Sequence, residues 1–373
     1  MAEDITKEEI QIQKDKIQEK KKEAFLKALD EANKKFSKKG EVDKVVSLLP
    51  DMDTDVKRFS TGSLVLNNII GGGFPQGRII EIFGGESSGK TSIALTTIAN
   101  VQKEGGNCIF IDAEQAFDPK YAAKLGVNKN ELALSQINAA EDVFQLIADV
   151  VRTGTVDLIV VDSVASLVPK QEEEAGIEKQ QMALLARIMS KGLKAIIKPC
   201  NDFRCSVIFL NQTREKVGLV FGNPTETPGG KALKFYASQR IHIKKQGQVK
   251  DEEGNVIGTE VKMKCIKNKV SQPFGEGLTV LTFDEGINKP AELKQISEQL
   301  GILIKKGHTY YIKHDEIIEG LEEGPNEDGL LKIAVYAKGA LEVLENNKLV
   351  YDVVSKKMLA ALQKKNANAS DVD

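Results

Sequence analysis

Short apolar runs alternate with longer mixed segments through the middle of the chain. Runs rich in Ile, Val and Phe occur at residues 79–83, 108–112, 158–162 and 206–211, and helical patterns lie between them. Continuous apolar runs of this length are typical of strands buried on both faces, and intervening helices favour parallel pairing. We therefore predict a parallel α/β sheet.

The two ends of the chain have other patterns. Residues 1–50 contain a helix rich in Lys and Glu, followed by a short apolar run at 42–49. The apolar face of this helix comprises Phe25, Leu26, Leu29, Ala32 and Phe36. Such a face needs a partner surface, so we predict an oligomerisation arm at residues 1–50.

The pattern changes again after residue 231. Residues 239–245, 259–267 and 278–283 resemble antiparallel strands, and residues 290–365 are mainly helical with one hairpin near 310–318. We predict a core domain at 51–287 and a small α+β C-terminal domain at 288–373. Its last residues, 366–373, are small and polar and are expected to be disordered.

Composition excludes several classes of protein. The chain has 373 residues, of which 41% are hydrophobic, enough for a large core and a second domain. The net charge of −2 indicates no general affinity for nucleic acid, so a DNA site must be local. No apolar run is long enough for a membrane span, and residues 1–22 lack the apolar block of a secretion signal, so we expect a cytoplasmic protein. The four cysteines, which lack C-x-x-C spacing, are interpreted as buried hydrophobic residues: Cys108, Cys200, Cys205 and Cys265.

The strongest chemical signal is a phosphate loop that follows the first predicted strand. It has the pattern G-x-x-x-x-G-K-[ST] and comprises Gly84, Gly85, Glu86, Ser87, Ser88, Gly89, Lys90 and Thr91. Glycines allow main-chain N–H groups to turn toward phosphate oxygens at a helix N-terminus. Lys90 would reach the β- and γ-phosphates, and the Thr91 hydroxyl would contact Mg²⁺. A Gly-rich turn without a ligand is the alternative.

Two carboxylates end neighbouring predicted strands. Asp162 ends residues 158–162, where it could hold Mg²⁺ through water, although such a residue alone is usually a helix cap. Glu114 follows residues 108–112 and is our candidate general base for an attacking water. Its alternative is a solvated loop glutamate.

A base-binding pair follows the candidate general base. Tyr121 could stack on adenine, and Asp118 could accept a hydrogen bond from the amino group of the base. The same residues would form a helix start capped by Asp118, and both interpretations can hold together.

Five segments together resemble the bacterial RecA recombinases: residues 60–64 (STGSL), 84–91, 112–114 (DAE), 161–165 (VDSVA) and 232–238 (ALKFYAS). The resemblance covers roughly residues 22–350. It implies a RecA-type phosphate-loop NTPase core, with helices on both faces of a mainly parallel sheet extended by antiparallel strands. It further implies a DNA-dependent ATPase that uses ATP and Mg²⁺ and forms a homo-oligomeric helical filament on single-stranded DNA. Such filaments pair with homologous double-stranded DNA and exchange strands in recombination, DNA repair and the SOS response, and promote self-cleavage of LexA-type repressors.

The resemblance also assigns two DNA-binding loops. Gln212 closes a buried strand near the expected γ-phosphate, where its amide could sense the nucleotide and signal to the following loop. That loop, residues 213–230 together with Lys231, is rich in glycine and hydrogen-bond donors, and would otherwise be interpreted as a mobile surface loop. Its candidate DNA contacts are Arg214, Val217, Phe221, Gly229, Gly230 and Lys231. The first loop, residues 169–182, is acidic, so its candidate contacts are Met182 and, on the next helix, Arg187, Ser190 and Lys194.

Lys267 and Lys269 are two residues apart on a predicted strand, so their side chains point to the same side. Charge on an edge strand is the usual explanation. The RecA resemblance instead implies that both lysines reach the phosphates of an ATP held by a neighbouring subunit, as an arginine finger does.

Two other functional classes are compatible with a phosphate loop. One is a hexameric helicase of the DnaB or RadA kind, which the absence of an N-terminal zinc module and the shape of the N-terminal arm disfavour. The other is a scaffold that binds ATP without hydrolysing it, which Glu114 disfavours. Electron microscopy and a phosphate-release assay respectively distinguish them from a recombinase.

Overall fold

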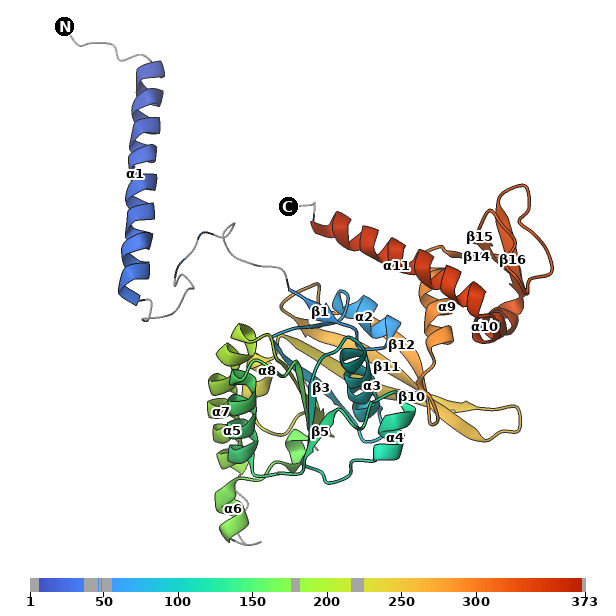
Figure 1. Ribbon diagram of the computed structural model, residues 1–373, viewed down its shortest axis with the longest axis horizontal. Helices are drawn as coiled ribbons and strands as arrows, with labels where there is room; N and C mark the ends of the chain where they lie inside the picture. The colour runs from blue at the N-terminus through green and yellow to red at the C-terminus, as the bar shows by residue number, and fades with distance from the viewer. Residues whose placement is uncertain are drawn as a thin grey trace. The chain divides into compact units, whose positions relative to one another are not determined.

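The computed structural model describes residues 7–36, 46, 48, 56–175, 182–215 and 225–370 (Figure 1). Contacts within the chain divide it into the compact units Met1–Val56 and Lys57–Asp373. The domain boundaries predicted at residues 50 and 287 stay predictions.

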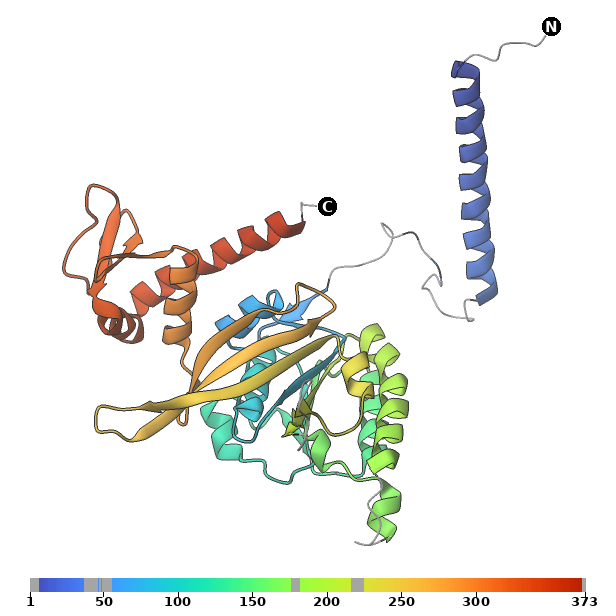
Figure 2. The same cartoon turned by 180° about the vertical axis from the view of Figure 1, so that it is seen from behind.

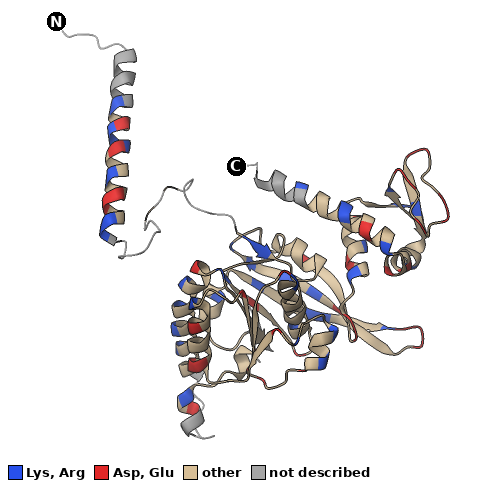
Figure 3. Ribbon diagram, viewed as in Figure 1, with Lys and Arg blue, Asp and Glu red and all other residues tan. Residues whose placement is uncertain are grey.

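The described part of the first unit contains the long helix α1 (Lys7–Phe36), along which acidic and basic residues are interspersed (Figure 3). Phe25 and Leu26 of its predicted apolar face are 54% and 42% exposed. At the C-terminal end of α1, the Asn33 side chain donates to the Val46 carbonyl oxygen (2.8 Å) and accepts from the Val46 N–H (2.7 Å). These two bonds hold the main chain of Val46 against the last turn of α1.

The main sheet of the second unit is largely parallel. Its strands are β3 (Ile79–Gly84), β4 (Cys108–Asp112), β5 (Leu132–Ser135), β6 (Leu158–Asp162), β7 (Ser206–Gln212), β10 (Gln239–Lys250), β11 (Val256–Asn268), β12 (Glu276–Thr282) and β13 (Gly286–Ile287). Their order is β13-β12-β11-β10-β3-β7-β6-β4-β5. The pairs from β10 to β5 are parallel, and those from β13 to β10 are antiparallel. The predicted parallel sheet with an antiparallel extension is therefore confirmed.

The predicted buried runs form the centre of this sheet. β4 and β6 have the predicted bounds, while β3 and β7 each extend one residue further. Every residue of β3 is buried, which explains why the pattern is a continuous apolar run. The carboxyl ends of these strands carry Gly84, Asp112, Asp162 and Gln212, so the predicted chemistry gathers at one edge of the sheet.

Helices cover both faces of the sheet (Figure 1). They are α2 (Leu64–Ile70), α3 (Lys90–Lys103), α4 (Pro119–Lys124), α5 (Ala140–Arg152), α6 (Lys170–Ala175), α7 (Met182–Asp202) and α8 (Ala232–Tyr236). Ile80 and Ile82 pack in one hydrophobic cluster with residues of α3, whereas Ile79 packs in a second cluster with residues of α5 and α7. Short pairs, β1 (Arg58–Phe59) with β2 (Phe74–Pro75) and β8 (Arg214–Glu215) with β9 (Thr225–Glu226), lie outside the main sheet.

The antiparallel extension is longer than predicted. Strands β10 and β11 continue beyond the predicted residues into a hairpin that projects from the sheet in both views (Figures 1 and 2). The turn is closed by Asp251, whose Oδ1 accepts from the Asn255 N–H at 2.8 Å. The outer part of the hairpin is largely exposed and polar, with acidic residues at 251–253, so it lacks the apolar alternation from which strands are predicted.

The C-terminal part contains more strand than predicted. Its elements are α9 (Lys289–Gln299), β14 (Leu303–Lys306), β15 (Thr309–Lys313), β16 (Leu330–Val335), α10 (Tyr336–Asn346) and α11 (Lys348–Ser370). The antiparallel sheet has the order β14-β15-β16, so the hairpin predicted near 310–318 was misplaced: it lies at 303–313. Helix α11 continues to Ser370, into the segment for which composition predicts disorder.

A buried carboxylate joins α9 to the core. Glu292 is 1% exposed, and its oxygens accept from the Ser63 hydroxyl (2.6 Å), the Leu64 N–H (2.6 Å) and the Thr279 hydroxyl (2.5 Å). Burial raises the pKa of Glu292, and these hydrogen bonds oppose the rise. The carboxylate thereby satisfies N–H groups at the start of α2, as an N-cap residue would.

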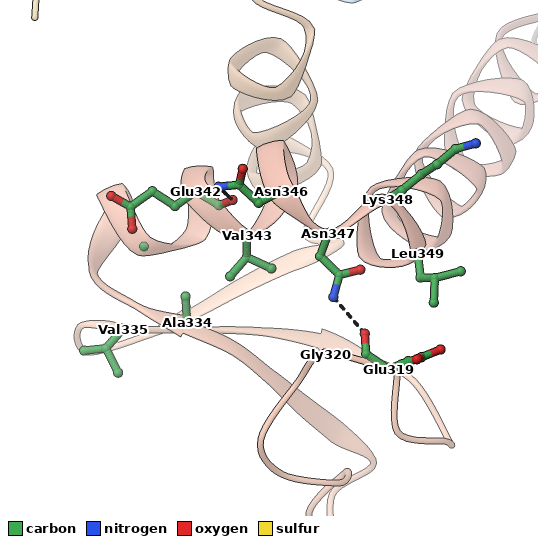
Figure 4. Close-up of a pocket in the computed structure, with 11 residues that line it drawn as sticks. Glu319, Gly320, Ala334, Val335, Glu342, Val343, Asn346, Asn347, Lys348 and Leu349 are labelled. Carbon is green, nitrogen blue, oxygen red and sulfur yellow. Dashed lines mark hydrogen bonds between the residues drawn. The ribbon is translucent and has the colours of Figure 1, made fainter.

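The C-terminal part also has a groove of about 680 Å³ between β16, α10 and the start of α11 (Figure 4). Asn347 donates across one end of it to the Glu319 carbonyl oxygen (2.8 Å). The lining residues are Glu319, Gly320, Ala334, Val335, Gly339, Glu342, Val343, Asn346, Asn347, Lys348 and Leu349. None of these belongs to the predicted sites.

The interpretation of the cysteines is confirmed. All four lie within the described residues, and each is buried and free. Burial raises the pKa of Cys108 and of Cys200 to about 12, so neither thiol is reactive near neutral pH. Among the described residues, no helix is both long enough and apolar enough to cross a membrane.

Candidate active site

The phosphate-loop segment connects β3 to α3. Gly89, the N-cap of α3, has a φ of 90°, and Ser87 has a φ of 51°. A Cβ atom on Gly84 would lie 2.1 Å from the Ile243 carbonyl oxygen, and one on Gly89 would lie 2.1 Å from Leu281 Cδ1. Close packing against main chain therefore requires glycine at position 84, and the positive φ favours glycine at position 89.

The Lys90 ammonium group is turned onto this loop. Its Nζ donates to the carbonyl oxygens of Gly84 (3.2 Å) and Gly85 (2.7 Å), and the Ser88 hydroxyl also donates to Gly85 (2.8 Å). Burial lowers the pKa of Lys90, while Asp162 and Glu114 act in the opposite direction. A phosphate would satisfy the same ammonium donors and supply the opposite charge, so the loop can exchange its own carbonyls for phosphate oxygens.

Thr91 and Asp162 meet where β6 ends beside the start of α3. The Thr91 hydroxyl donates to Asp162 Oδ2 at 2.8 Å. Burial raises the pKa of Asp162 to about 6, and the Thr91 hydrogen bond opposes the rise. A hydroxyl and a carboxylate next to a phosphate loop are oxygen ligands of the kind that Mg²⁺ prefers, so the residues fit the predicted ion.

Glu114 and Gln212 are brought together across the sheet edge. Gln212 Nε2 donates to Glu114 Oε1 at 3.0 Å. Ser163, which the sequence analysis did not single out as a site residue, donates from its hydroxyl to the same oxygen at 2.6 Å. The candidate base thus contacts Ser163, the residue after β6, and Gln212, the last residue of β7 before the second predicted DNA loop.

Asp112, named in the sequence analysis only as part of a motif, holds the loop that carries Glu114. It is buried, and its two oxygens accept from the N–H groups of Ala116 (3.1 Å) and Phe117 (3.0 Å). Gln115 in this loop has a φ of 57°. The carboxylate therefore stabilises a turn that would otherwise leave these N–H groups without partners.

Asp118 is the N-cap of α4, as one of its two interpretations stated. Its Oδ1 accepts from the N–H groups of Lys120 (2.8 Å) and Tyr121 (3.2 Å). The Tyr121 hydroxyl lies 2.7 Å from the Ser92 hydroxyl of α3. The tyrosine ring therefore lies close to the helix that follows the phosphate loop, and its contact with adenine stays a prediction.

Lys267 and Lys269 converge on the end of α8. Lys267 Nζ donates to the carbonyl oxygens of Lys234 (2.7 Å) and Phe235 (2.8 Å), and Lys269 Nζ donates to Phe235 at 3.1 Å. Burial, followed by the charges of Lys269 and Arg240, lowers the pKa of Lys267 to about 8. The two ammonium groups share one acceptor, which confirms that they point to the same side. At Lys267, β11 pairs with β10 only, because its register with β12 ends at Lys264, and Lys269 follows the end of the strand at Asn268. The edge-strand explanation and the role on a neighbouring subunit both stay predictions.

The predicted first DNA loop is partly helical. Residues 170–175 form α6, residues 176–181 lie outside the described residues, and α7 begins at Met182, whose side chain is also not described. Arg187 and Lys194 are exposed on α7, and Ser190 is half-buried. The spacing of three and four residues places these three side chains along one face of the helix, where they could contact a nucleic-acid backbone together.

The predicted second DNA loop is closed at its base by the β8–β9 pair, in which Arg214 lies opposite Glu226. Val217 and Phe221 lie outside the described residues, as does the side chain of Arg214. Lys231 is exposed at the N-cap of α8.

Gly229 and Gly230 have a structural explanation in addition to the predicted one. Their φ angles are 83° and 78°, and a Cβ atom on either residue would lie 2.8 Å from a side chain, Val164 for Gly229 and Ala186 for Gly230. Glycine is required here by packing against the 3₁₀ helix η2 (Val164–Ser166) and α7, whether or not DNA is bound. Contact between their N–H groups and phosphates stays a prediction.

A buried polar network that sequence reasoning missed supports Gln212 from below. Glu81, which is fully buried, forms an ion pair with Arg240 and accepts from Asn211 Nδ2 at 3.1 Å. Asn211 also donates to the Pro228 carbonyl oxygen (3.2 Å) and accepts from the Gln212 N–H (3.0 Å). The sequence carries one signal of this network, because Glu81 is a charged residue in an otherwise apolar strand and a buried carboxylate must be paired.

Comparison with known proteins agrees with this arrangement. The model of the RecA N-terminal domain matches residues 23–288. The chain belongs to the RecA family. It is 43% identical over 343 residues to the protein RecA of Mycoplasma mobile, covering 91% of this chain and 97% of that protein. It is 46% identical over 301 residues to Protein RecA of Mesomycoplasma hyopneumoniae strain 7448 (80% and 88% covered), and 45% identical over 312 residues to that of Streptococcus sanguinis (83% and 82% covered).

Membership of the RecA family defines the activity. The chain is an ATP-binding, DNA-dependent ATPase and a recombinase that acts in DNA recombination and repair. The mainly parallel sheet and the predicted RecA-type core are confirmed with it. The roles of individual site residues stay predictions.

Proposed function

We propose that this protein assembles as a filament on single-stranded DNA, pairs it with homologous double-stranded DNA, and couples strand exchange to ATP hydrolysis at the edge of the β3–β7–β6–β4 sheet. One observation supports this proposal above the others: Gln212 donates to Glu114 at 3.0 Å. The candidate base is thereby in direct contact with the last residue of β7, which precedes the second predicted DNA loop. A DNA strand that orders the loop can change the position of Gln212 and so the surroundings of Glu114.

In the proposed reaction, Lys90 binds the β- and γ-phosphates, and its charge stabilises the negative charge that develops there. Glu114 takes a proton from a water molecule as the water oxygen bonds to the γ-phosphorus. The bond between the γ-phosphorus and the bridging oxygen breaks, and ADP leaves with that oxygen. Thr91 and Asp162 would hold Mg²⁺, which neutralises phosphate charge when bound.

Lys267 and Lys269 act on a neighbouring subunit in this proposal. Their described acceptors are main-chain carbonyls, which orient the ammonium groups without neutralising them. Two positive charges directed to one place suit an anion supplied by another molecule, and the ATP phosphates of the adjacent filament subunit are such an anion. Hydrolysis would then depend on assembly.

Further partners are proposed on family membership alone. One partner is a LexA-type repressor, whose self-cleavage the filament would promote. The proposed location is the cytoplasm, where the DNA substrate lies. The free, buried cysteines suit a reducing compartment.

The proposal is tested with Glu114→Gln, which removes the base but keeps a side chain of the same size. ATP affinity should be unchanged, and DNA-stimulated hydrolysis should fall at least about a hundredfold, as expected for loss of a general base. The filament should persist longer on DNA, because hydrolysis releases the protein. An unchanged turnover rate would transfer the role of base to another carboxylate.

A further inference from the structure

Ser163 has a buried hydroxyl whose described donor contact is the candidate base. The residue is 1% exposed, and Oγ donates to Glu114 Oε1 at 2.6 Å. Ser163 is also the N-cap residue of η2, yet its side chain makes no capping hydrogen bond within the described residues. The hydroxyl is therefore not explained by the secondary structure that follows it.

Glu114 needs such a contact because little else holds its side chain. The residue is exposed, and an exposed glutamate samples several rotamers. Its main chain, by contrast, is tied to β6: the N–H groups of Ala113 and Glu114 donate to the Asp162 carbonyl oxygen at 2.7 and 3.1 Å. Ser163, the residue after Asp162, extends this attachment from the main chain to the carboxylate.

The two donors to Glu114 Oε1 differ in how firmly they are anchored. Ser163 is buried directly after a central strand, whereas Gln212 is half-buried at the end of β7. In the described part of the chain, the side-chain hydrogen bonds to Glu114 fall on Oε1. The Ser163 bond can persist when Gln212 moves, and it leaves Oε2 to accept a proton from water.

We propose that Ser163 is a positioning residue for ATP hydrolysis, which holds the Glu114 carboxylate in place after Gln212 has turned away. This inference rests on the proposed role of Glu114 as the base. Ser163 contacts neither ATP nor water in this role, so it should affect turnover and leave nucleotide binding unchanged.

The test compares Ser163→Ala with Ser163→Thr, which keeps a hydroxyl. Ser163→Ala should lower kcat of DNA-stimulated hydrolysis about tenfold, because a displaced base loses part of the benefit of orientation, while KM for ATP stays unchanged. Ser163→Thr should recover most of this loss. Ser166→Ala is the matched control, since it removes a half-buried hydroxyl from the same 3₁₀ helix and should leave kcat unchanged.

A double variant separates this inference from the proposed function. In the Glu114→Gln background, Ser163→Ala should cause no further loss, because the group that Ser163 positions is no longer a base. If Glu114→Gln alone leaves turnover unchanged, the proposed function fails. If Glu114→Gln is slow but Ser163→Ala has normal kcat, or if the two losses multiply, only the positioning role is overturned. Filament formation on DNA with ATP verifies that Ser163→Ala is folded.

Discussion

The two groups of residues assigned to hydrolysis are held in different ways. Around the phosphate loop, side chains satisfy one another at one edge of the sheet: Thr91 donates to Asp162, and Gln212 donates to Glu114. Lys267 and Lys269 instead donate to main-chain carbonyls at the end of α8. In the first group, each carboxylate accepts a hydrogen bond from a neighbouring side chain. In the second group, the described acceptors are neutral carbonyls, so the ammonium groups keep their positive charge. In the proposed function, one subunit therefore supplies most of its own ATPase site and presents a cationic group to an anion held by another molecule.

The largest effect is expected from removing the charge of the phosphate loop. Lys90→Ala should abolish nucleotide-dependent activity, because the γ-phosphate loses its main neutralising group. Lys90→Arg should bind ATP but hydrolyse it poorly, since its planar fork does not reproduce the geometry of an ammonium. Phosphate release with and without single-stranded DNA measures both. Lys103→Ala, an exposed position in the last turn of the same helix, is the control. Wild-type hydrolysis by Lys90→Ala would mean that the site is wrongly assigned.

The second prediction separates the two groups directly. Replacing both Lys267 and Lys269 with Ala should leave ATP binding by an isolated subunit intact and eliminate DNA-stimulated hydrolysis. Mixing this variant with an excess of Lys90→Ala should restore partial hydrolysis, because one protein supplies the loop and the other supplies the lysines. Lys262→Ala, on the same strand and paired with Glu276 at 2.9 Å, should remain active.

Absence of rescue, with co-assembly on DNA verified by microscopy, would contradict the trans mechanism. The lysines would then act within their own subunit or only support the fold.

The smallest effect is a pH dependence. The Lys267 pKa of about 8 means that its ammonium is lost as pH rises through that value, so DNA-stimulated hydrolysis should decline above about pH 8. The contribution of Lys267 to stability changes with pH in the opposite direction to hydrolysis. Between the folded and unfolded pKa values of this lysine, the unfolded chain binds more protons, so the free energy of unfolding rises with pH. Lys267→Arg, which keeps its charge, should remove the decline in hydrolysis. Identical profiles for the two proteins would show that Lys267 does not control the alkaline limb.

The sequence predicts the central sheet well because those strands are buried on both faces. The apolar run at residues 158–162 is short and rich in Ile and Val, as a buried strand is, and the polar residue that ends it marks the sheet edge. The β10–β11 hairpin was underestimated because its outer half is exposed and polar, so pairing there depends on the partner strand and on the Asp251 turn. The β14-β15-β16 sheet was predicted only as one misplaced hairpin for a related reason, since its strands alternate buried and partly exposed positions and lack continuous apolar runs.

The same reasoning explains which site residues were found. Lys90, Thr91 and Asp162 follow from local order in the chain, because a motif and a strand end place them. Ser163 and the Glu81–Arg240 pair depend on contacts between strands distant in sequence, and a serine carries no sign of its acceptor. Gly229 and Gly230 show the converse: their residue type was attributed to a ligand, whereas packing against Val164 and Ala186 already requires it.

Glu292 has a consequence for modularity. The region that matches the RecA N-terminal domain ends at residue 288, four residues before a carboxylate that is buried at the start of α2. A polypeptide ending at 288 would keep the whole phosphate loop, yet it would leave the Leu64 N–H and the Ser63 and Thr279 hydroxyls without their acceptor. The segment that matches the family model therefore omits an acceptor used by its own α2, so a polypeptide ending at 288 should have a lower free energy of unfolding than one that ends after α9.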